Sequence, residues 1–150
     1  MDRFMEIAYE EALLGISKKH GGPFGALIVR NNEVVAQGHN EVLLRQDPTA
    51  HAEIVVIRAA CEQLNTVNLS DCVLYATAKP CPMCKGAIQW SRIQKVVFSG
   101  DYKDTERLSF DDLQFSTSFG SEEEHCLQID QEHFKTLIDA FAAYKEEIKY

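Results

Sequence analysis

The stretch PTAHAEI places an imidazole and a carboxylate, His51 and Glu53, two positions apart at the predicted start of a helix. Positions i and i+2 point about 200° apart around a helix, so these two side chains cannot share a face. They can approach one point only if it lies beyond the helix end, near the axis. The spacing therefore predicts a site just off the N-terminus of this helix.

The stretch KPCPMC carries the second pair of reactive side chains, Cys81 and Cys84, at another predicted helix start. A C-x-x-C pair there can be a redox pair, because a helix N-terminus lowers a thiol pKa. It can also provide two of the four ligands of a structural zinc site. Such a site usually draws on two closely spaced pairs, and this chain has no second C-x-x-C and no H-x-x-x-H.

The upstream residue with comparable placement is His51, at the start of the other helix. We expect three other histidines, which have no such local pairing, at the surface or in loops: His39, His125 and His133. Three ligands leave one position open, which a catalytic zinc keeps for water. We therefore predict one catalytic Zn²⁺ held by His51, Cys81 and Cys84.

Glu53 lies in the first turn of its helix, where it can reach a zinc-bound water without being a ligand. Zinc supplies hydroxide near neutral pH, because it lowers the pKa of the bound water. One carboxylate can serve in turn as general base and general acid. This donor set is therefore suited to hydrolysis by a zinc-bound water.

The remaining chain supplies the elements that would position these residues. Hydrophobic spacing and turn residues predict helices and strands in the order helix 2–19, strands 24–30 and 33–40, a helix whose start is marked by 47–49 and which runs through 52–64, strand 72–78, helix 80–92, strand 95–100 and helix 134–145. Residues 101–121 show no periodicity and are expected to form a packed loop. Alternating strands and helices from residue 51 onward predict an α/β fold with parallel crossovers, and 1–150 as a single domain.

Composition restricts the class of protein further. The chain has 150 residues, 45% of them hydrophobic, and lacks the ~20-residue apolar run of a membrane span. Acidic residues near the N-terminus argue against a secretory signal, so we expect a cytoplasmic protein without a membrane partner. Five cysteines in such a chain are more often buried, metal-bound or catalytic than cross-linked.

His51-Ala52-Glu53 followed by Pro80-Cys81-Pro82-Met83-Cys84 matches the H-x-E…P-C-x-x-C signature of zinc nucleobase deaminases. With GGPFGALIV, GHNEV, DPTAHAEI, PCPMCKGAI and FDD, the sequence resembles the cytidine deaminase-like superfamily, and within it the small bacterial guanine deaminases. The resemblance implies a three-layer α/β/α sandwich around a mixed five-stranded sheet.

The resemblance also implies Zn²⁺ as the cofactor, one ion per subunit, and Glu53 as the proton shuttle. It implies five substrate contacts: Phe24, Asn40, Ala52, Asp112 and Tyr150. Read from the residues alone, Phe24 could be core, Asn40 could close a turn, and Asp112 could be a solvated loop acid. An amide at Asn40 offers the donor and acceptor that a purine edge needs.

Two features concern parts of the chain outside the motifs. In the family the C-terminal segment, here about 130–150, is exchanged between subunits, so the resemblance implies a domain-swapped homodimer with Tyr150 near the substrate. The family usually has Glu where this chain has Lys79, which reverses one charge beside the metal loop.

The expected reaction is hydrolysis of guanine, a small-molecule purine base, to xanthine and ammonia. The alternatives are a tRNA adenosine (wobble) deaminase, which RQDPTAHAEI and SRIQKVVF also resemble, a deaminase of another amino-heterocycle or nucleoside, and a zinc-stapled interaction module. A net charge of −8, with −2 over residues 130–150, disfavours a nucleic-acid partner, because phosphates must be met by basic side chains.

Overall fold

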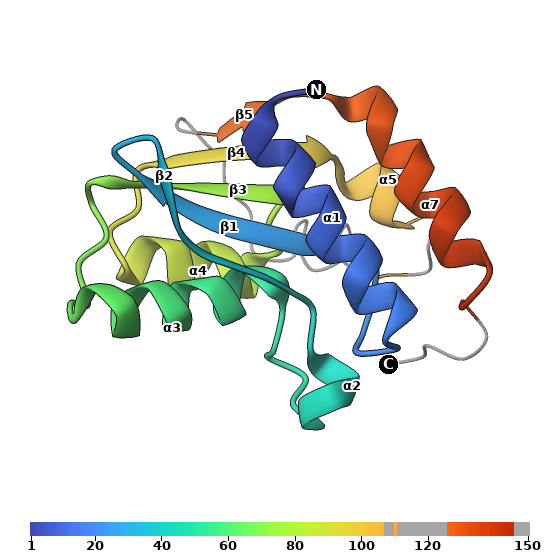
Figure 1. The fold of residues 1–150 in the computed structure, drawn as a ribbon, viewed down its shortest axis with the longest axis horizontal. Helices are drawn as coiled ribbons and strands as arrows, with labels where there is room; N and C mark the ends of the chain where they lie inside the picture. Colours follow the sequence, from blue (N-terminus) through green and yellow to red (C-terminus); the bar gives the residue numbers. More distant parts are fainter. Residues whose placement is uncertain (107–109, 111–125, 146–150) are drawn as a thin grey trace.

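The structure is a computed structural model that describes residues 1–106, 110 and 126–145. The elements are α1 (Arg3–Ser17), β1 (Gly25–Arg30), β2 (Glu33–His39), α2 (Val42–Arg45), α3 (Ala52–Leu64), β3 (Cys72–Ala78), α4 (Pro82–Trp90), β4 (Lys95–Gly100), α5 (Tyr102–Glu106), β5 (Cys126–Gln128), η1 (Gln131–His133) and α7 (Phe134–Ala142). One sheet with strand order β2-β1-β3-β4-β5 lies between α1 and α7 on one face and α3 and α4 on the other (Figure 1). The predicted α/β/α sandwich with a mixed five-stranded sheet is confirmed.

The direction of β1 brings the chemically interesting segments to one edge of the sheet. β1 is antiparallel to β2 and β3, whereas β3, β4 and β5 are parallel. The start of β1 therefore lies beside the ends of β2 and β3, and Gly25 pairs with His39 while Ala78 pairs with Gly100. The carboxyl ends of parallel strands are a common place for ligand sites in α/β folds.

Alternation along β1 divides its side chains between two cores. Leu27 and Val29 pack in the core beneath α1 and α7, whereas Ala26 and Ile28 pack in the core beneath α3 and α4. This is the period-2 geometry of a strand, and it explains why the run is apolar on both faces. The two cores together hold the sheet edge in place from both sides.

Several short elements were not predicted from the sequence. They are α2, α5 and β5, each too short for hydrophobic periodicity to reveal. The predicted loop 101–121 begins as the helical turn α5, and residues 107–109 and 111–125 lie outside the described residues. The predicted terminal helix is found as α7, and Phe134, Leu137 and Phe141 pack it into the core that contains α1.

The position predicted for His39 was wrong. It is buried, with 7% of its surface exposed, at the end of β2. An added Cβ at Gly15 of α1 would come within 2.7 Å of the His39 ring, so the imidazole lies against this helix. No local pattern indicates that α1 covers this strand end. His133 is 39% exposed at its side chain, as expected, and His125 lies outside the described residues.

No helix among the described residues has the length and apolar character needed to cross a membrane.

A single added methyl group tests the close packing of α1 on β1. A Cβ at Gly25 would come within 2.0 Å of the Ala8 carbonyl oxygen, which is backbone and cannot rotate away. We expect Gly25→Ala to lower the free energy of unfolding by about 1–3 kcal/mol or more, the usual cost of overpacking. Urea denaturation of the zinc-loaded protein measures the change.

Gly86 provides the matched control, because a Cβ there meets nothing within 4 Å on α4. Gly86→Ala should raise the free energy of unfolding by about 0.5–1 kcal/mol, since Gly is unfavourable inside a helix. Equal effects of the two substitutions would contradict the packing described here.

Candidate metal centre

The residues of the two sequence motifs occupy the N-terminal ends of α3 and α4. His51 is the N-cap residue of α3, and Cys81 is the N-cap residue of α4, with Pro82 in its first turn and Cys84 one turn further. Neither N-cap side chain makes a capping hydrogen bond within its helix. Both helices lie on the same face of the sheet (Figure 1), so their N-termini can hold one group between them.

The three predicted ligands converge. His51 Nδ1 lies 3.6 Å from Cys81 Sγ and 3.6 Å from Cys84 Sγ. A tetrahedral zinc with bonds of ~2.3 Å to sulfur and ~2.0–2.1 Å to nitrogen separates these atoms by about 3.6 Å. The spacing and the donor types therefore fit Zn²⁺. Within the part of the chain that the structure describes, no fourth His, Cys, Asp or Glu joins this group.

The two thiols differ in their titration. The hydrogen bond from Cys84 lowers the pKa of Cys81 to about 4, with His51 contributing in the same direction. The same hydrogen bond, together with burial, raises the pKa of Cys84 well above its usual range. Coordination of a dication would deprotonate both thiols.

Glu53 lies beside the ligands without being one of them. Its side chain sits in the first turn of α3 and is 8% exposed. Burial, and then the charge of Cys81, raise the pKa of Glu53 to about 7. A carboxyl group in this environment exchanges protons near neutral pH, as a general acid–base requires.

A pocket opens in front of these groups. The empty space between its walls, including the open solvent at its mouth, is about 370 Å³. Its described walls are Phe24, Asn40, His51, Glu53, Ala78, Lys79, Cys81 and Phe110. Two of the five predicted substrate contacts, Phe24 and Asn40, therefore lie in the same pocket as the ligands.

Aromatic rings form one wall of this pocket. Phe24 and Phe110 meet edge to face with their centroids 4.9 Å apart, and Phe110 lies 6.1 Å from Phe141 of α7. Phe110 was not among the predicted contacts, although it begins the FDD stretch that suggested the family. Its neighbour Asp112 lies outside the described residues, as does Tyr150.

Asn40 is held from several directions. Its Oδ1 accepts the Val42 N–H at 3.0 Å, and its own N–H donates to the Phe24 carbonyl at 2.9 Å. A Cβ at Gly21 would come within 2.0 Å of Oδ1, so glycine is required there. Asn40 thus closes a turn and lines the pocket at once. Ala52 differs, because its side chain is 1% exposed and packs in the core rather than among the described pocket walls.

Lys79 also lines the pocket. Its Nζ lies 4.8 Å from the centre of the Tyr102 ring, and Lys85 Nζ lies 5.2 Å from the same ring. The Tyr102 hydroxyl donates to the Pro80 carbonyl at 2.5 Å. Cation–π contacts and this hydrogen bond tie the metal-binding loop to α5.

Comparison with known proteins agrees with this arrangement. Residues 1–100 match the model of the cytidine and deoxycytidylate deaminase zinc-binding region. Guanine deaminase of Bacillus subtilis is 43% identical over 111 residues, which are 74% of this chain and 71% of that protein. Its crystal structure covers 97% of this chain, and 95% of that chain is matched, with a TM-score of 0.75 and 36% identity.

Two further relatives bear on the substrate. The tRNA-specific adenosine deaminase of Aquifex aeolicus is 46% identical over 96 residues, 64% of this chain and 63% of that protein. A guanine deaminase structure from Nitrosomonas europaea has a TM-score of 0.80 and 25% identity, over 93% of this chain and 83% of that one. Sequence similarity to guanine and to tRNA deaminases is thus of comparable strength.

Removing one sulfur tests the predicted ligand set. We expect Cys84→Ser to weaken zinc binding by more than the about 10–100-fold that the loss of an outer-shell partner costs. Zinc per chain, measured by elemental analysis after dialysis against a competing chelator, reports the change. Cys61→Ser on α3 is the control and should keep its zinc; equal metal loss from both variants would contradict the assignment.

Proposed function

This chain belongs to the cytidine and deoxycytidylate deaminase zinc-binding family, and from that premise we propose that it hydrolyses a free purine base, guanine, to xanthine and ammonia. The observation that carries the proposal is the convergence of three zinc-type donors and a buried carboxylate at one end of an aromatic-walled pocket. A deaminase needs these parts together, whereas a structural zinc site needs neither the pocket nor the acid.

His51, Cys81 and Cys84 would hold the zinc ion. When bound, zinc acts as a Lewis acid that makes water nucleophilic near neutral pH. The chain's own contribution is to fix the three donors before an ion arrives, because each sits at a helix terminus or within its first turn. The helix dipoles add a favourable field for the two thiolates.

Glu53 would move the protons. It takes one from the attacking water and delivers it to the ring nitrogen beside the carbon under attack. Glu53 then takes the proton of the newly added hydroxyl and delivers it to the amino nitrogen, so that the C–N bond breaks, ammonia leaves and the attacked carbon becomes a carbonyl. The position of Glu53 in the pocket wall, beside the ligands, supports this role.

The walls of the pocket suit a small, planar substrate. Phe24 and Phe110 present aromatic surface against which a base can pack. Asn40 in the same wall carries an amide that can hydrogen-bond a purine edge. Asp112 and Tyr150 remain proposed contacts, and so does Ala52, whose side chain is packed in the core.

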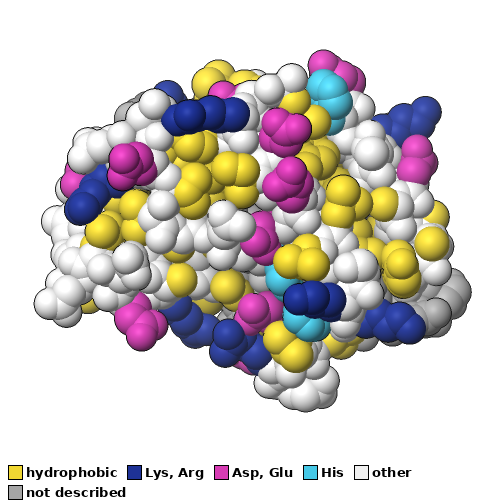
Figure 2. All heavy atoms as spheres, in the orientation of Figure 1, with side chains coloured by type: hydrophobic (Ala, Val, Ile, Leu, Met, Phe, Trp, Pro, Cys, Tyr) yellow, Lys and Arg dark blue, Asp and Glu magenta, His cyan; other side chains and the backbone are white. Residues whose placement is uncertain are grey.

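Charge supports a free base over an RNA. The chain carries −8 overall, and the C-terminal residues 130–150 carry five acids and three lysines. On the face drawn in Figure 2, acidic side chains lie among basic ones. An anticodon stem needs several basic side chains near its phosphates. The alignment with guanine deaminase also spans more of this chain, 74% against 64%.

A tRNA adenosine deaminase is the second candidate. It is supported by the 46% identity to the Aquifex enzyme, which has the higher identity over its shorter alignment.

A homodimer with an exchanged segment 130–150, a single domain over 1–150 and a cytoplasmic location also remain proposals. In the structure α7 packs on α1 of its own chain, so an exchange would replace this contact with an equivalent one from a second copy.

Removing the charge of the buried carboxylate tests the mechanism. We expect Glu53→Gln to keep its zinc and its fold but to lower kcat by about 10²–10⁴-fold, the usual contribution of a general acid–base. Ammonia release and zinc content are measured together. Glu62→Gln, at an exposed position of the same helix, is the control and should retain full activity. A Glu53→Gln variant as active as the parent would remove the proton shuttle.

A substrate panel tests the choice of a free base. We expect ammonia from guanine and none from an anticodon stem-loop containing adenosine, because the pocket and the net charge suit a small neutral ring. Guanosine, adenine and other amino-heterocycles complete the panel. Turnover of the stem-loop alone would establish the second candidate in place of the first.

A further inference from the structure

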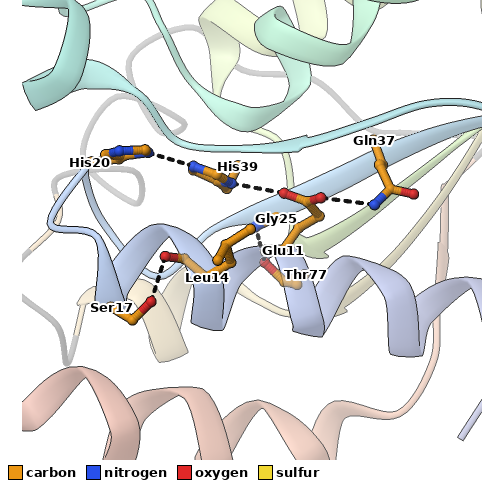
Figure 3. A network of polar contacts seen from close by, with 8 residues as sticks. All are labelled: Glu11, Leu14, Ser17, His20, Gly25, Gln37, His39 and Thr77. Atoms are coloured by element: carbon orange, nitrogen blue, oxygen red, sulfur yellow. Dashed lines mark hydrogen bonds and ion pairs between the residues drawn. The ribbon is translucent and has the colours of Figure 1, made fainter.

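A hydrogen-bonded network of three titratable side chains lies next to the pocket without forming part of its described walls (Figure 3). Glu11 of α1 binds His39 Nδ1 through Oε2 at 2.8 Å and accepts Gln37 Nε2 through Oε1 at 2.9 Å. His39 Nε2 in turn lies 2.9 Å from His20 Nδ1, and the two rings stack with centroids 5.1 Å apart. This network joins α1, the end of β2 and the segment after α1.

The middle of this network is shielded from solvent. The side chains of His39 and Glu11 are 9% and 12% exposed, and the His39 ring is pressed against Gly15. A buried carboxylate whose oxygens are both bonded is costly to disturb, since an unmatched group would keep its full desolvation penalty. The Glu11–His39 contact is therefore the fixed end, and His20 is the end nearer the solvent.

Backbone hydrogen bonds and sequence neighbours connect this network to the pocket at two points. The His20 carbonyl accepts the N–H groups of Leu43 and Leu44 at 2.9 and 3.1 Å. Asn40 directly follows His39, and its N–H donates to the carbonyl of Phe24. The segments 20–24 and 39–44 are thus bonded to each other through the His20–His39 contact at one end and the Asn40–Phe24 bond at the other.

We propose that Glu11, His39 and His20 form a clamp that positions Asn40 and Phe24 in the substrate pocket. What the pocket binds rests on the proposed function, but the clamp itself rests on the hydrogen bonds above. Glu11, His39 and His20 are positioning residues, because they act through Asn40 rather than through substrate.

The number of protons on the His39 and His20 rings decides whether the contact between them can form. His39 Nδ1–H donates to Glu11, and the single contact between His39 Nε2 and His20 Nδ1 needs one proton between two nitrogens. It forms when both rings are neutral or when one is protonated. When both are protonated, two N–H groups face each other at 2.9 Å and the contact must open.

The surroundings disfavour a proton on His20. Burial, then His39 of β2 and Lys18 at the C-cap of α1, lower the pKa of His20 from its ordinary 6.5, while Glu41 before α2 acts in the opposite direction. A lowered folded-state pKa means that the native arrangement favours the neutral His20 ring, so its contribution to stability is present above pH 6.5 and is lost as the pH falls through the lower value. Acidification should therefore loosen the segments 20–24 and 39–44.

The Val42 backbone N–H is a direct reporter of the Asn40 side chain, because it donates to Asn40 Oδ1. In the zinc-loaded protein we expect His20→Ala and Glu11→Ala to speed Val42 hydrogen exchange by about tenfold, as the loss of a hydrogen bond would. His20→Asn, which keeps a polar atom near the Nδ1 position, should restore the parent rate. Leu74 in the centre of β3 should not change in any variant.

Two further readouts separate positioning from general stability. Glu10→Ala, at the exposed neighbour of Glu11, should leave Val42 exchange unchanged. Below pH 6.5, Val42 exchange corrected for its intrinsic rate should rise in the parent and stay flat in His20→Asn. With guanine, His20→Ala should raise KM by about tenfold and change kcat by less than about twofold, as the loss of one hydrogen bond in substrate binding would.

Unchanged Val42 exchange in His20→Ala would overturn the clamp, as would an equal increase in Glu10→Ala. His20→Ala changes a half-exposed side chain, so it remains informative if Glu11→Ala fails to fold. A parent protein that deaminates no purine would overturn the proposed function, yet the exchange measurements would still decide the clamp.

Discussion

Two helix N-termini meet at the carboxyl end of β3, and the candidate site depends on this meeting. His51 begins α3 and Cys81 begins α4, so the ligands are held by backbone positions that the helices themselves define. Their donor atoms are spaced as a tetrahedral zinc requires, with no movement of the chain. The same helix ends favour negative charge, which stabilises the thiolates.

The sheet converts this local arrangement into a pocket. Because β1 runs antiparallel to β3, the residue before β1 and the residue after β2 reach the edge at which α4 begins. Phe24 and Asn40 arrive there from β1 and β2, which are the next two strands on one side of β3. The pocket walls and the candidate metal ligands thus come from separate segments that share one sheet edge.

The face of the sheet that carries α1 contributes to the site at a distance. α1 supplies Glu11, which fixes His39 at the end of β2, and the C-terminal helix α7 supports Phe110 through Phe141. Lys79 and Tyr102 brace the metal-binding loop from the other direction. A pocket built in this way is sensitive to packing well away from the zinc, because its walls are the ends of elements whose cores lie on both faces.

Local sequence determined the elements that carry the ligands, the ligand types and the acid beside them. The spacing of the motif residues at two helix starts restricts where their side chains can point, so roles could be predicted for His51, Glu53, Cys81 and Cys84. The strand and helix periods are also strong along most of the chain. The short elements α2, α5 and β5 could not, since so few residues carry no period. The burial of His39, its chain to Glu11 and His20, and the place of Phe110 in the pocket were decided only by tertiary structure. They join residues far apart in sequence, and the packing of α1 across the end of β2 has no counterpart in any local pattern.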